Sequence, residues 1–504
     1  MTYFTHEYQI VNLAIRKANN NIILLFSTLL FLLATPTQAQ DKGKLNVLFM
    51  ISDDLTTTAI SSYENRASQT PNIDQLAAKG TQFTKAYCQY PVCGPSRASM
   101  MFGYYPNATT TYGYVSGREN VGEKRQSWAQ LFKDNGYYTA RVGKIFHMGS
   151  VDIMKGRDGK DDSASWTERY NSPAPEVHAK GSRELVQNNP FGLLEISNDT
   201  NWNGGNQINI VKTIENEIHT DAETANKVSE LLRLHKNEPF FIAAGFFRPH
   251  VPFVAPKSSF EDYPYEQVVL PPRVANDWDD IPEQGINYVN SLNGEMTEVQ
   301  EKKAIAAYYA STSFLDEQVG KVLQTLKDEG LEDNTIVIFT SDHGLFLGEH
   351  RFWMKVGLME ESVRVPLIIK VPGQKPTVCH SFAELIDLYP TISELAGLKA
   401  PATLQGQSLA ELIENPEKEV RDFAFSVSQR NGRMGHLIRT KDWAFIQYGE
   451  KAEGGMELYD MNYDKGQYNN LANYPQYSNV ISEMQYLLKG KLADVRNIDL
   501  GITY

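Results

Sequence analysis

Residues 45–54 read Leu-Asn-Val-Leu-Phe-Met-Ile-Ser-Asp-Asp, an apolar run that ends in two carboxylates. A run of this length and character is typical of a strand buried inside a parallel sheet. Similar runs occur at 240–246, 335–340 and 365–370, and helical patterns occur between them at 220–235 and 300–331. Strands that alternate with helices predict a doubly wound α/β domain with a large, mostly parallel central sheet flanked by helices.

Other parts of the chain complete the predicted domain. We expect a strand at 137–142 and helices at 70–77, 127–135 and 382–395. The segments 150–205 and 256–293 have little periodicity, and long segments of this kind are often functional. Residues 40–419 are therefore assigned to one main domain.

From about residue 420 the pattern changes to short strands separated by turns at 431–432, 441–442 and 454–455. Residues 420–504 therefore predict a smaller C-terminal α+β subdomain with an antiparallel sheet and a final helix at 479–495. Cys88 and Cys379 could pair in a disulfide or stay buried and free. We favour free thiols, because unpaired Cys is commonly a small core residue.

Polar side chains stand where the predicted strands end. Asp53 and Asp54 follow the first strand, and Asp342 and His343 follow the strand at 335–340. Open α/β sheets bind ligands beyond the carboxyl ends of their strands. Taken alone, the Asp pair is open to two interpretations, a metal site or a solvated turn.

The motif Cys93-Gly94-Pro95-Ser96-Arg97 predicts the start of a helix, because Pro is favoured in the first helical turn. Cys93 would then stand at the positive end of the helix, which attracts anions. Arg97 adds a planar fork that binds oxyanions. The motif predicts a nucleophile beside an anion-binding site.

Further basic groups occur in three motifs, Gly143-Lys144-Ile145-Phe146-His147, Arg248-Pro249-His250 and Glu349-His350-Arg351-Phe352-Trp353-Met354-Lys355. Considered singly, Lys144 and Lys355 could be solvated charges, and His147 and His250 could be structural. The net charge of −13 argues against general nucleic-acid binding. The negative net charge does not exclude an anionic substrate, provided that a few basic residues converge on one site.

The N-terminus has the features of a signal peptide. Arg16 and Lys17 precede an apolar run at 22–34, and Thr37-Gln38-Ala39 forms a small-residue cleavage site. The apolar run is shorter than the roughly 20 residues that span a bilayer. We expect cleavage after residue 39 and export to the periplasm or the medium, without a stable membrane anchor. An uncleaved segment that tethers the protein is the alternative.

Together these motifs resemble the type I sulfatases, in which the Cys of a Cys-x-Pro-Ser-Arg signature is oxidised to formylglycine (3-oxoalanine) by a maturation enzyme. The spelling of Asp342-His343-Gly344, of Leu-Gly-Glu-His at 347–350 and of Arg-Pro-His-Val-Pro-Phe at 248–253 is similar to the iduronate-2-sulfatase branch. The resemblance covers about residues 45–472. It implies a sulfatase/alkaline-phosphatase-like fold, with residues 40–419 as the catalytic domain.

The resemblance also implies a site. One calcium ion would be bound by Asp53, Asp54, Asp342, His343 and the group at Cys93. Oxygen ligands suit this hard cation, whereas many family members have Asn where His343 stands.

Formylglycine would hydrate to a gem-diol that attacks sulfur, with Arg97 and Lys144 holding the hydrated aldehyde. His250 and Lys355 would bind the sulfate and help to protonate the leaving oxygen. His147 would take the proton that allows sulfate to leave. These roles are carried over from the family.

The implied function is hydrolysis of sulfate esters in a sulfated oligo- or polysaccharide, such as ulvan or glycosaminoglycan fragments, with uronate 2-O-sulfate among the candidates. Loops such as 150–205 and 256–293 would set the substrate. Two alternatives stay open. One is a phosphate or phosphonate ester hydrolase of the same superfamily, and the other is a non-catalytic, calcium-dependent binder of sulfated glycans.

Overall fold

The computed structural model describes residues 43–63, 67–178, 181–185, 208–430 and 432–497. The chain divides into two units, Met1–Lys44 and Leu45–Tyr504, and the described helices and strands belong to the second unit. The signal peptide predicted over 1–39 lies outside the described residues, as does part of the predicted excursion at 150–205.

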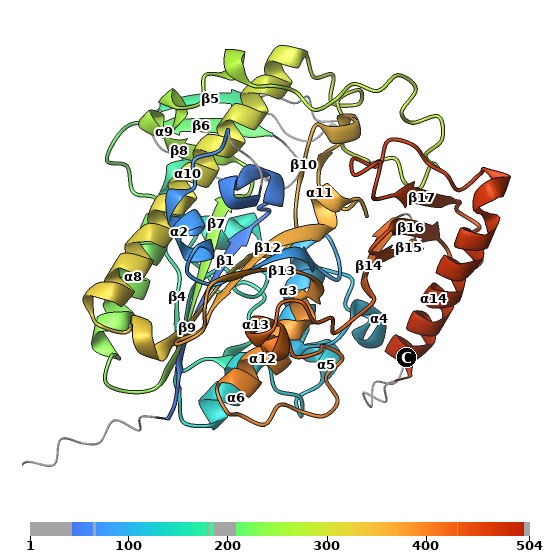
Figure 1. The fold of residues 1–504 in the computed structure, drawn as a ribbon. Coiled ribbons are helices and arrows are strands. Elements are labelled where there is room, and N and C mark those ends of the chain that lie inside the picture. Colours follow the sequence, from blue (N-terminus) through green and yellow to red (C-terminus); the bar gives the residue numbers. More distant parts are fainter. Residues whose placement is uncertain (1–42, 64–66, 179–180, 186–207, 431, 498–504) are drawn as a thin grey trace, which may run out of the picture. The chain divides into compact units, whose positions relative to one another are not determined.

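The predicted first strand becomes β1 and lies inside an eight-stranded sheet (Figure 1). β1 pairs in parallel with β7 and with β9, and all its side chains are buried. Only β12 runs antiparallel to its two neighbours, so the prediction of a mostly parallel sheet is confirmed. In spatial order the strands are β13 (Thr377–Glu384), β2 (Thr81–Tyr87), β12 (Arg364–Lys370), β9 (Thr335–Ser341), β1 (Asn46–Asp53), β7 (Phe240–Pro249), β3 (Tyr138–Gly143) and β4 (Glu168–Tyr170).

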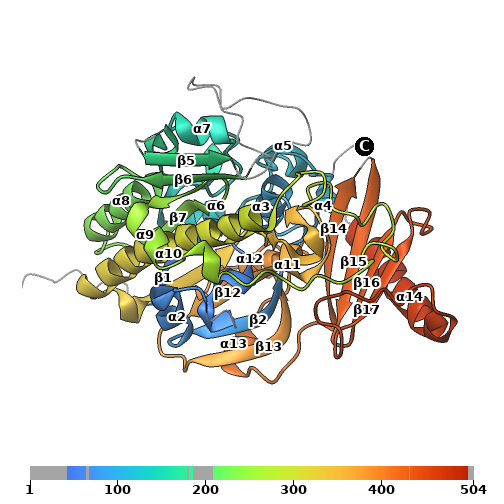
Figure 2. The same ribbon diagram turned by 90° about the horizontal axis from the view of Figure 1, so that it is seen from above.

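Helices cover both faces of this sheet (Figures 1 and 2). Side chains alternate between the faces of a strand, so Val47 and Phe49 enter one core cluster and Leu48 and Met50 enter another. The first cluster includes side chains of α3 (Cys93–Phe102), α6 (Trp128–Asp134), α12 (Leu388–Leu395) and α13 (Ala410–Glu414). The second includes side chains of α2 (Pro71–Ala77), α8 (Thr220–Leu234) and α10 (Glu298–Asp328).

One predicted helix begins later than expected. The pattern at 382–395 predicts a helix throughout, but Phe382 to Glu384 end β13 and pair with Lys85 to Tyr87 of β2. The helical part starts with the 3₁₀ turn Leu385–Asp387 and continues as α12. Pairing with a strand that is distant in sequence overrides the local preference at this point. The local pattern did not predict β2 itself.

The C-terminal region is a four-stranded antiparallel sheet of consecutive strands, as predicted. One of its faces packs on α14 through an apolar cluster that includes Phe425, Ile438, Met484 and Leu488. The position of a domain boundary at 419/420 stays a prediction. The elements are β14 (Phe423–Arg430), β15 (Arg433–Thr440), β16 (Trp443–Tyr448), β17 (Met456–Asp460) and α14 (Ser478–Arg496).

Smaller elements connect these layers. β5, β6 and β8 form a three-stranded sheet, and β10 and β11 form a short hairpin. The bounds are α4 (Pro106–Thr109), α5 (Arg118–Val121), α7 (Ser150–Met154), β5 (Gly181–Leu185), β6 (Asn209–Thr213), β8 (Phe253–Pro256), α9 (Lys257–Glu261), β10 (Phe346–Leu347), β11 (Trp353–Met354) and α11 (Glu360–Val363). Cys88 and Cys379 are both buried and free. Within the described ranges, no helix combines the length and apolarity needed to span a membrane.

Candidate active site

The polar residues predicted at the strand ends come together in the structure. Asp53 and Asp54 lie at the end of β1, Asp342 and His343 follow β9, and Cys93 is the first residue of α3. Their side chains are buried. The backbone N–H of Asp54 donates to Asp342 Oδ1 at 3.1 Å, across a separation of 288 residues. The parallel register of β1 and β9 therefore brings Asp53 and Asp54 to the same edge of the sheet as Asp342 and His343.

Cys93 is at the centre of this group. Its Sγ lies 3.1 Å from Lys355 Nζ, 3.3 Å from His343 Nε2 and 3.7 Å from Asp54 Oδ1. Burial, reinforced by the charge of Asp53, raises the pKa of the Cys93 thiol well above its usual value. A catalytic thiolate has the opposite property, a lowered pKa. The surroundings of Cys93 therefore do not suit a direct thiolate nucleophile.

Arg97 lies one turn further along α3 and is fully buried. Its Nε donates to Asp342 Oδ2 at 2.8 Å and its Nη2 to Asp53 Oδ1 at 3.1 Å. Its Nη1 donates to the backbone carbonyls of Lys144 and Ile145. The guanidinium thus joins the ends of β1 and β9 to the segment after β3.

Lys144 and Lys355 are not solvated surface charges. Lys144 Nζ lies 2.5 Å from Asp53 Oδ2, and Lys355 Nζ lies 2.7 Å from Asp54 Oδ1. Burial alone would raise the pKa of both carboxyl groups, but the adjacent lysine charges outweigh it. The pKa of Asp53 falls well below its usual value and that of Asp54 falls to about 2. Both carboxylates are therefore ionised at neutral pH.

The two histidines expected to transfer protons, His250 and His147, lie near the carboxylates. His250 Nε2 is 3.8 Å from Asp54 Oδ2, and its Nδ1 is 2.7 Å from the carbonyl of Val251. Burial lowers the pKa of His250 to about 4, even though Asp54 opposes the shift. The ring of His147 lies against that of Tyr114 in a tilted arrangement, with 4.6 Å between ring centroids. Burial and then the charge of Lys144 lower the pKa of His147 to about 2, so both rings are neutral without a bound anion.

The backbone at the site adopts strained conformations. Asp54 has φ +62°, and Met354 and Val356, on either side of Lys355, have φ +69° and +90°. Such values are rare for non-glycine residues, and for a β-branched residue such as Val356 they are outliers. Tyr308 of α10 holds Asp54 in place, because its hydroxyl donates to the Asp54 carbonyl at 2.6 Å. Strain that the surroundings enforce is common at functional sites.

Sequence reasoning did not identify Tyr308, and it also missed the support of His250. Arg248 Nη1 donates to the carbonyls of His250 and Pro252 at 3.3 and 3.2 Å. Arg248 Nη2 in turn donates to Glu176 Oε1 at 2.8 Å, and both side chains are buried. Glu176 belongs to the segment 150–205, whose lack of periodicity gave no sign of a buried ion pair. The acid therefore positions the His250 loop through Arg248.

Replacing Glu176 by Ala should destabilise the protein and lower kcat. Removing one partner of a buried charged hydrogen bond costs about 1.5–3 kcal/mol in the free energy of unfolding. A misplacement of His250 by about 1 Å could reduce the rate roughly 100-fold. Urea unfolding and steady-state kinetics measure the two effects.

Two further variants control this experiment. Glu176→Gln keeps an acceptor for Arg248 and should restore most of both properties. Glu119→Ala replaces an exposed acid and should be neutral. Wild-type kcat and stability in Glu176→Ala would show that Arg248 holds the loop without its acid partner.

The buried group can bind a cation. One ligand atom each from Asp54, Cys93, Asp342 and His343 lie within 4.8 Å of one another. Asp53, Cys93 and His250 form a second such set. Carboxylate oxygens favour a hard cation such as Ca²⁺. The two sets share Cys93, and the carboxylate of Asp53 faces Arg97 and Lys144 as well.

Residues 45–398, which carry every one of these side chains, match the sequence profile of the sulfatases. The chain belongs to the sulfatase family. It is therefore a sulfuric ester hydrolase. Residues 348–494 also match the profile described as N-sulphoglucosamine sulphohydrolase, C-terminal, which includes the antiparallel sheet.

Relatives of this sulfatase agree with the assignment. A protein named sulfatase from Formosa agariphila is 31% identical over 463 residues, which cover 89% of this chain and 87% of the relative. Human iduronate 2-sulfatase is 31% identical over 447 residues, which cover 80% and 78% of the two chains. A solved phosphonate monoester hydrolase from Silicibacter pomeroyi shares the fold, with a TM-score of 0.71, 21% identity and coverage of 90% and 96%.

Proposed function

We propose that this sulfatase is exported and hydrolyses sulfate esters of a sulfated oligo- or polysaccharide, using formylglycine formed from Cys93 and a bound calcium ion. The observation that carries the proposal is the surroundings of Cys93 Sγ. It lies at the N-terminus of α3, 3.1 Å from Lys355 Nζ, among the carboxylates that could bind a cation. Similarity to iduronate 2-sulfatase supports a glycan substrate.

The residues present fit a calcium ion. Asp53, Asp54, Asp342 and His343 would hold it together with the group at position 93. Three carboxylates supply hard oxygen donors, while His343 adds a nitrogen donor that calcium rarely uses. When bound, the ion would supply positive charge that stabilises the sulfate oxygens in the transition state.

The protein's own residues also suit an anionic substrate. Lys355 Nζ contacts both Asp54 and Cys93, so a sulfate group at position 93 would meet this ammonium directly. Arg97 donates all its N–H groups to Asp53, Asp342 and backbone carbonyls, whereas Lys144 Nζ donates to Asp53. Their main contribution would be to keep the carboxylates of Asp53 and Asp342 ionised and in fixed positions. Formylglycine at position 93, once formed, supplies the hydrated aldehyde that attacks sulfur.

His250 and His147 would move the protons. His250 keeps Nε2 directed at the Asp54 side of the site, because its Nδ1 faces the Val251 carbonyl. Both rings are neutral in the free protein. A bound sulfate anion would raise their pKa values, since a nearby negative charge favours the imidazolium. His250 could then donate to the leaving oxygen, and His147 could accept a proton from the group at position 93.

Sulfate and phosphonate esters of the same alcohol test the reaction class. We expect the matured protein to hydrolyse the sulfate ester at least tenfold faster in kcat/KM, a difference of about 1.4 kcal/mol in transition-state stabilisation. The control is the same pair of esters with Cys93→Ala, which reports the background. Faster hydrolysis of the phosphonate would assign the protein to the other branch of the superfamily.

A panel of sulfated glycans tests the substrate class. Release of sulfate from ulvan or glycosaminoglycan oligosaccharides would support the proposal, and release only from small aryl sulfates would contradict it. N-terminal sequencing of the secreted protein tests the cleavage expected after residue 39.

A further inference from the structure

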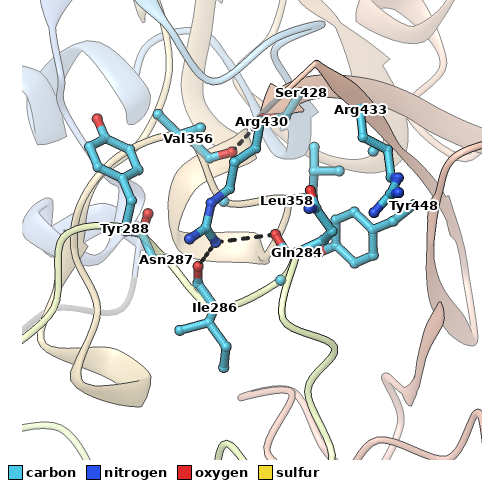
Figure 3. A pocket seen from close by; sticks show the side chains of 13 residues that line it. Gln284, Ile286, Asn287, Tyr288, Val356, Leu358, Ser428, Arg430, Arg433 and Tyr448 are labelled. Carbon is cyan, nitrogen blue, oxygen red and sulfur yellow. Dashed lines mark hydrogen bonds between the residues drawn. The ribbon is translucent and has the colours of Figure 1, made fainter. Parts of the chain in front are cut away.

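A small cavity lies where the C-terminal sheet meets the segment after residue 283 (Figure 3). Tyr288 and Val356 line one side of it, and Arg433 and Tyr448 line the other. Val356 follows Lys355 directly, so their Cα atoms are about 3.8 Å apart. The cavity lining thus includes the chain neighbour of Lys355, which contacts Cys93, and the Val356 N–H donates to the carbonyl of Pro91, two residues before Cys93.

Tyr288 links the cavity electrostatically to the catalytic residues. Burial raises the pKa of Tyr288 to about 12, and Tyr114, Lys355, Asp54 and Cys93 also act on it. Tyr114, whose ring contacts that of His147, is 57% exposed. Tyr288 therefore lines the cavity and is also within the electrostatic influence of Lys355, Asp54 and Cys93.

The lining of the cavity is basic, with two arginines and no Asp or Glu among its residues. Arg430 is already committed, because its Nη1 donates to the carbonyls of Glu283, Gln284 and Ile286. The guanidinium of Arg433 makes no hydrogen bond or ion pair with any residue that the structure describes. Glu453, whose pKa is lowered by backbone hydrogen bonds and then by the Arg433 charge, does not form an ion pair with it.

Two other hollows differ in this respect. One is lined by Asp277 and Asp279 beside Arg273 and Arg351. The other is lined by Glu450 beside Lys451, Lys489 and Arg496. Their basic residues have acidic neighbours, whereas Arg433 lines a cavity without one. An arginine that is half-buried and has no acid within ion-pair range is suited to bind an anion from outside.

The size of the cavity limits what can enter. It offers about 20 Å³ to water-sized groups, and a single water needs roughly 10–15 Å³ on this measure. A sugar ring does not fit, but a flat group that projects from a sugar does. A carboxylate matches both this size and the planar fork of a guanidinium.

We propose that Arg433 is a specificity-determining residue that binds a carboxylate of the glycan while the sulfate ester occupies the site at Cys93. This inference rests on the proposed function and narrows the substrate to a sulfated glycan that contains a uronate. The C-terminal sheet, which supplies Arg433, then takes part in substrate selection.

Three matched substrates test the proposal: a sulfated disaccharide that contains a uronate, the same disaccharide with its carboxyl reduced to an alcohol, and a disulfated hexosamine. Arg433→Gln should lower kcat/KM at least tenfold on the uronate substrate, mainly through KM. It should leave the carboxyl-reduced substrate within twofold of wild type. Arg433→Lys keeps the charge but loses the fork, so an intermediate loss is expected.

The control is Arg496→Gln, which removes a surface arginine paired with Glu450. It should leave kcat/KM unchanged on all three substrates. An equal loss on all three substrates, no loss on the uronate, or a loss confined to the disulfated hexosamine would overturn the assignment of Arg433. Failure of the wild type to release sulfate from every substrate would instead overturn the proposed function. Thermal unfolding of each variant confirms that the fold is intact.

Discussion

Cys93→Ala is expected to abolish sulfate release, with a loss of activity to the uncatalysed background, while the protein stays folded. The side chain is small and is replaced by a smaller one, so the fold should tolerate the change. Formylglycine cannot form from alanine, and none of the neighbouring groups can replace the hydrated aldehyde. Sulfate release from a glycan and a thermal unfolding curve measure the two parts of this prediction.

The matched control is Cys88→Ala, because Cys88 is also a buried, free thiol but lies in the apolar core cluster. It should keep full activity. Retained activity in Cys93→Ala would remove Cys93 from the mechanism.

Mass analysis of the peptide that contains Cys93 adds a second readout. Loss of sulfur with gain of a carbonyl supports the enzyme, and an intact thiol in all preparations supports a binding protein instead.

Arg97→Met should destabilise the protein by about 3–5 kcal/mol and stop turnover. The guanidinium is fully buried and pairs with both Asp53 and Asp342. Removing one member of a buried ionic group leaves uncompensated charge, which is the costly case. Urea unfolding in the presence of a chelator measures the loss of stability.

Two comparisons make the Arg97 experiment specific. Arg157→Met removes an exposed pair with Asp152 and should change stability by less than about 1 kcal/mol. Adding calcium should recover part of the stability of Arg97→Met, because the ion would compensate the same carboxylates. If Arg97→Met lowers the free energy of unfolding by less than about 1 kcal/mol in the presence of a chelator, the carboxylates take up protons instead of staying charged.

Much of the architecture could be predicted from local patterns. The run at 45–51 is apolar on both faces, and this is required of a strand that is covered by helices on both sides. The approximate ends of β1, β9 and α8 follow from where apolar residues give way to polar ones. The failures have one cause: β2 and the start of α12 are set by pairing between segments that are almost 300 residues apart, and no local pattern records such pairing.

Part of the candidate site could also be predicted from the sequence. Asp53, Asp54, Asp342 and His343 could be grouped because parallel strands end at one edge of a sheet. Tyr308, Glu176 and Arg433 could not be found. Tyr308 looks like an ordinary residue of the buried face of α10, and Glu176 lies in a segment without a distinctive pattern. Arg433 directly follows the predicted turn at 431–432, but nothing in that turn indicates that it lines a cavity.

Local patterns predicted the order of the main elements and the polar side chains at the strand ends, because apolar periodicity and short motifs are local properties. Only the tertiary structure decided what each charged group does. Arg97 faces two carboxylates, the lysines are buried counter-ions, and Arg433 lines a cavity without an acid. Burial and the distance between charges govern these outcomes, and both depend on how segments distant in the chain pack together.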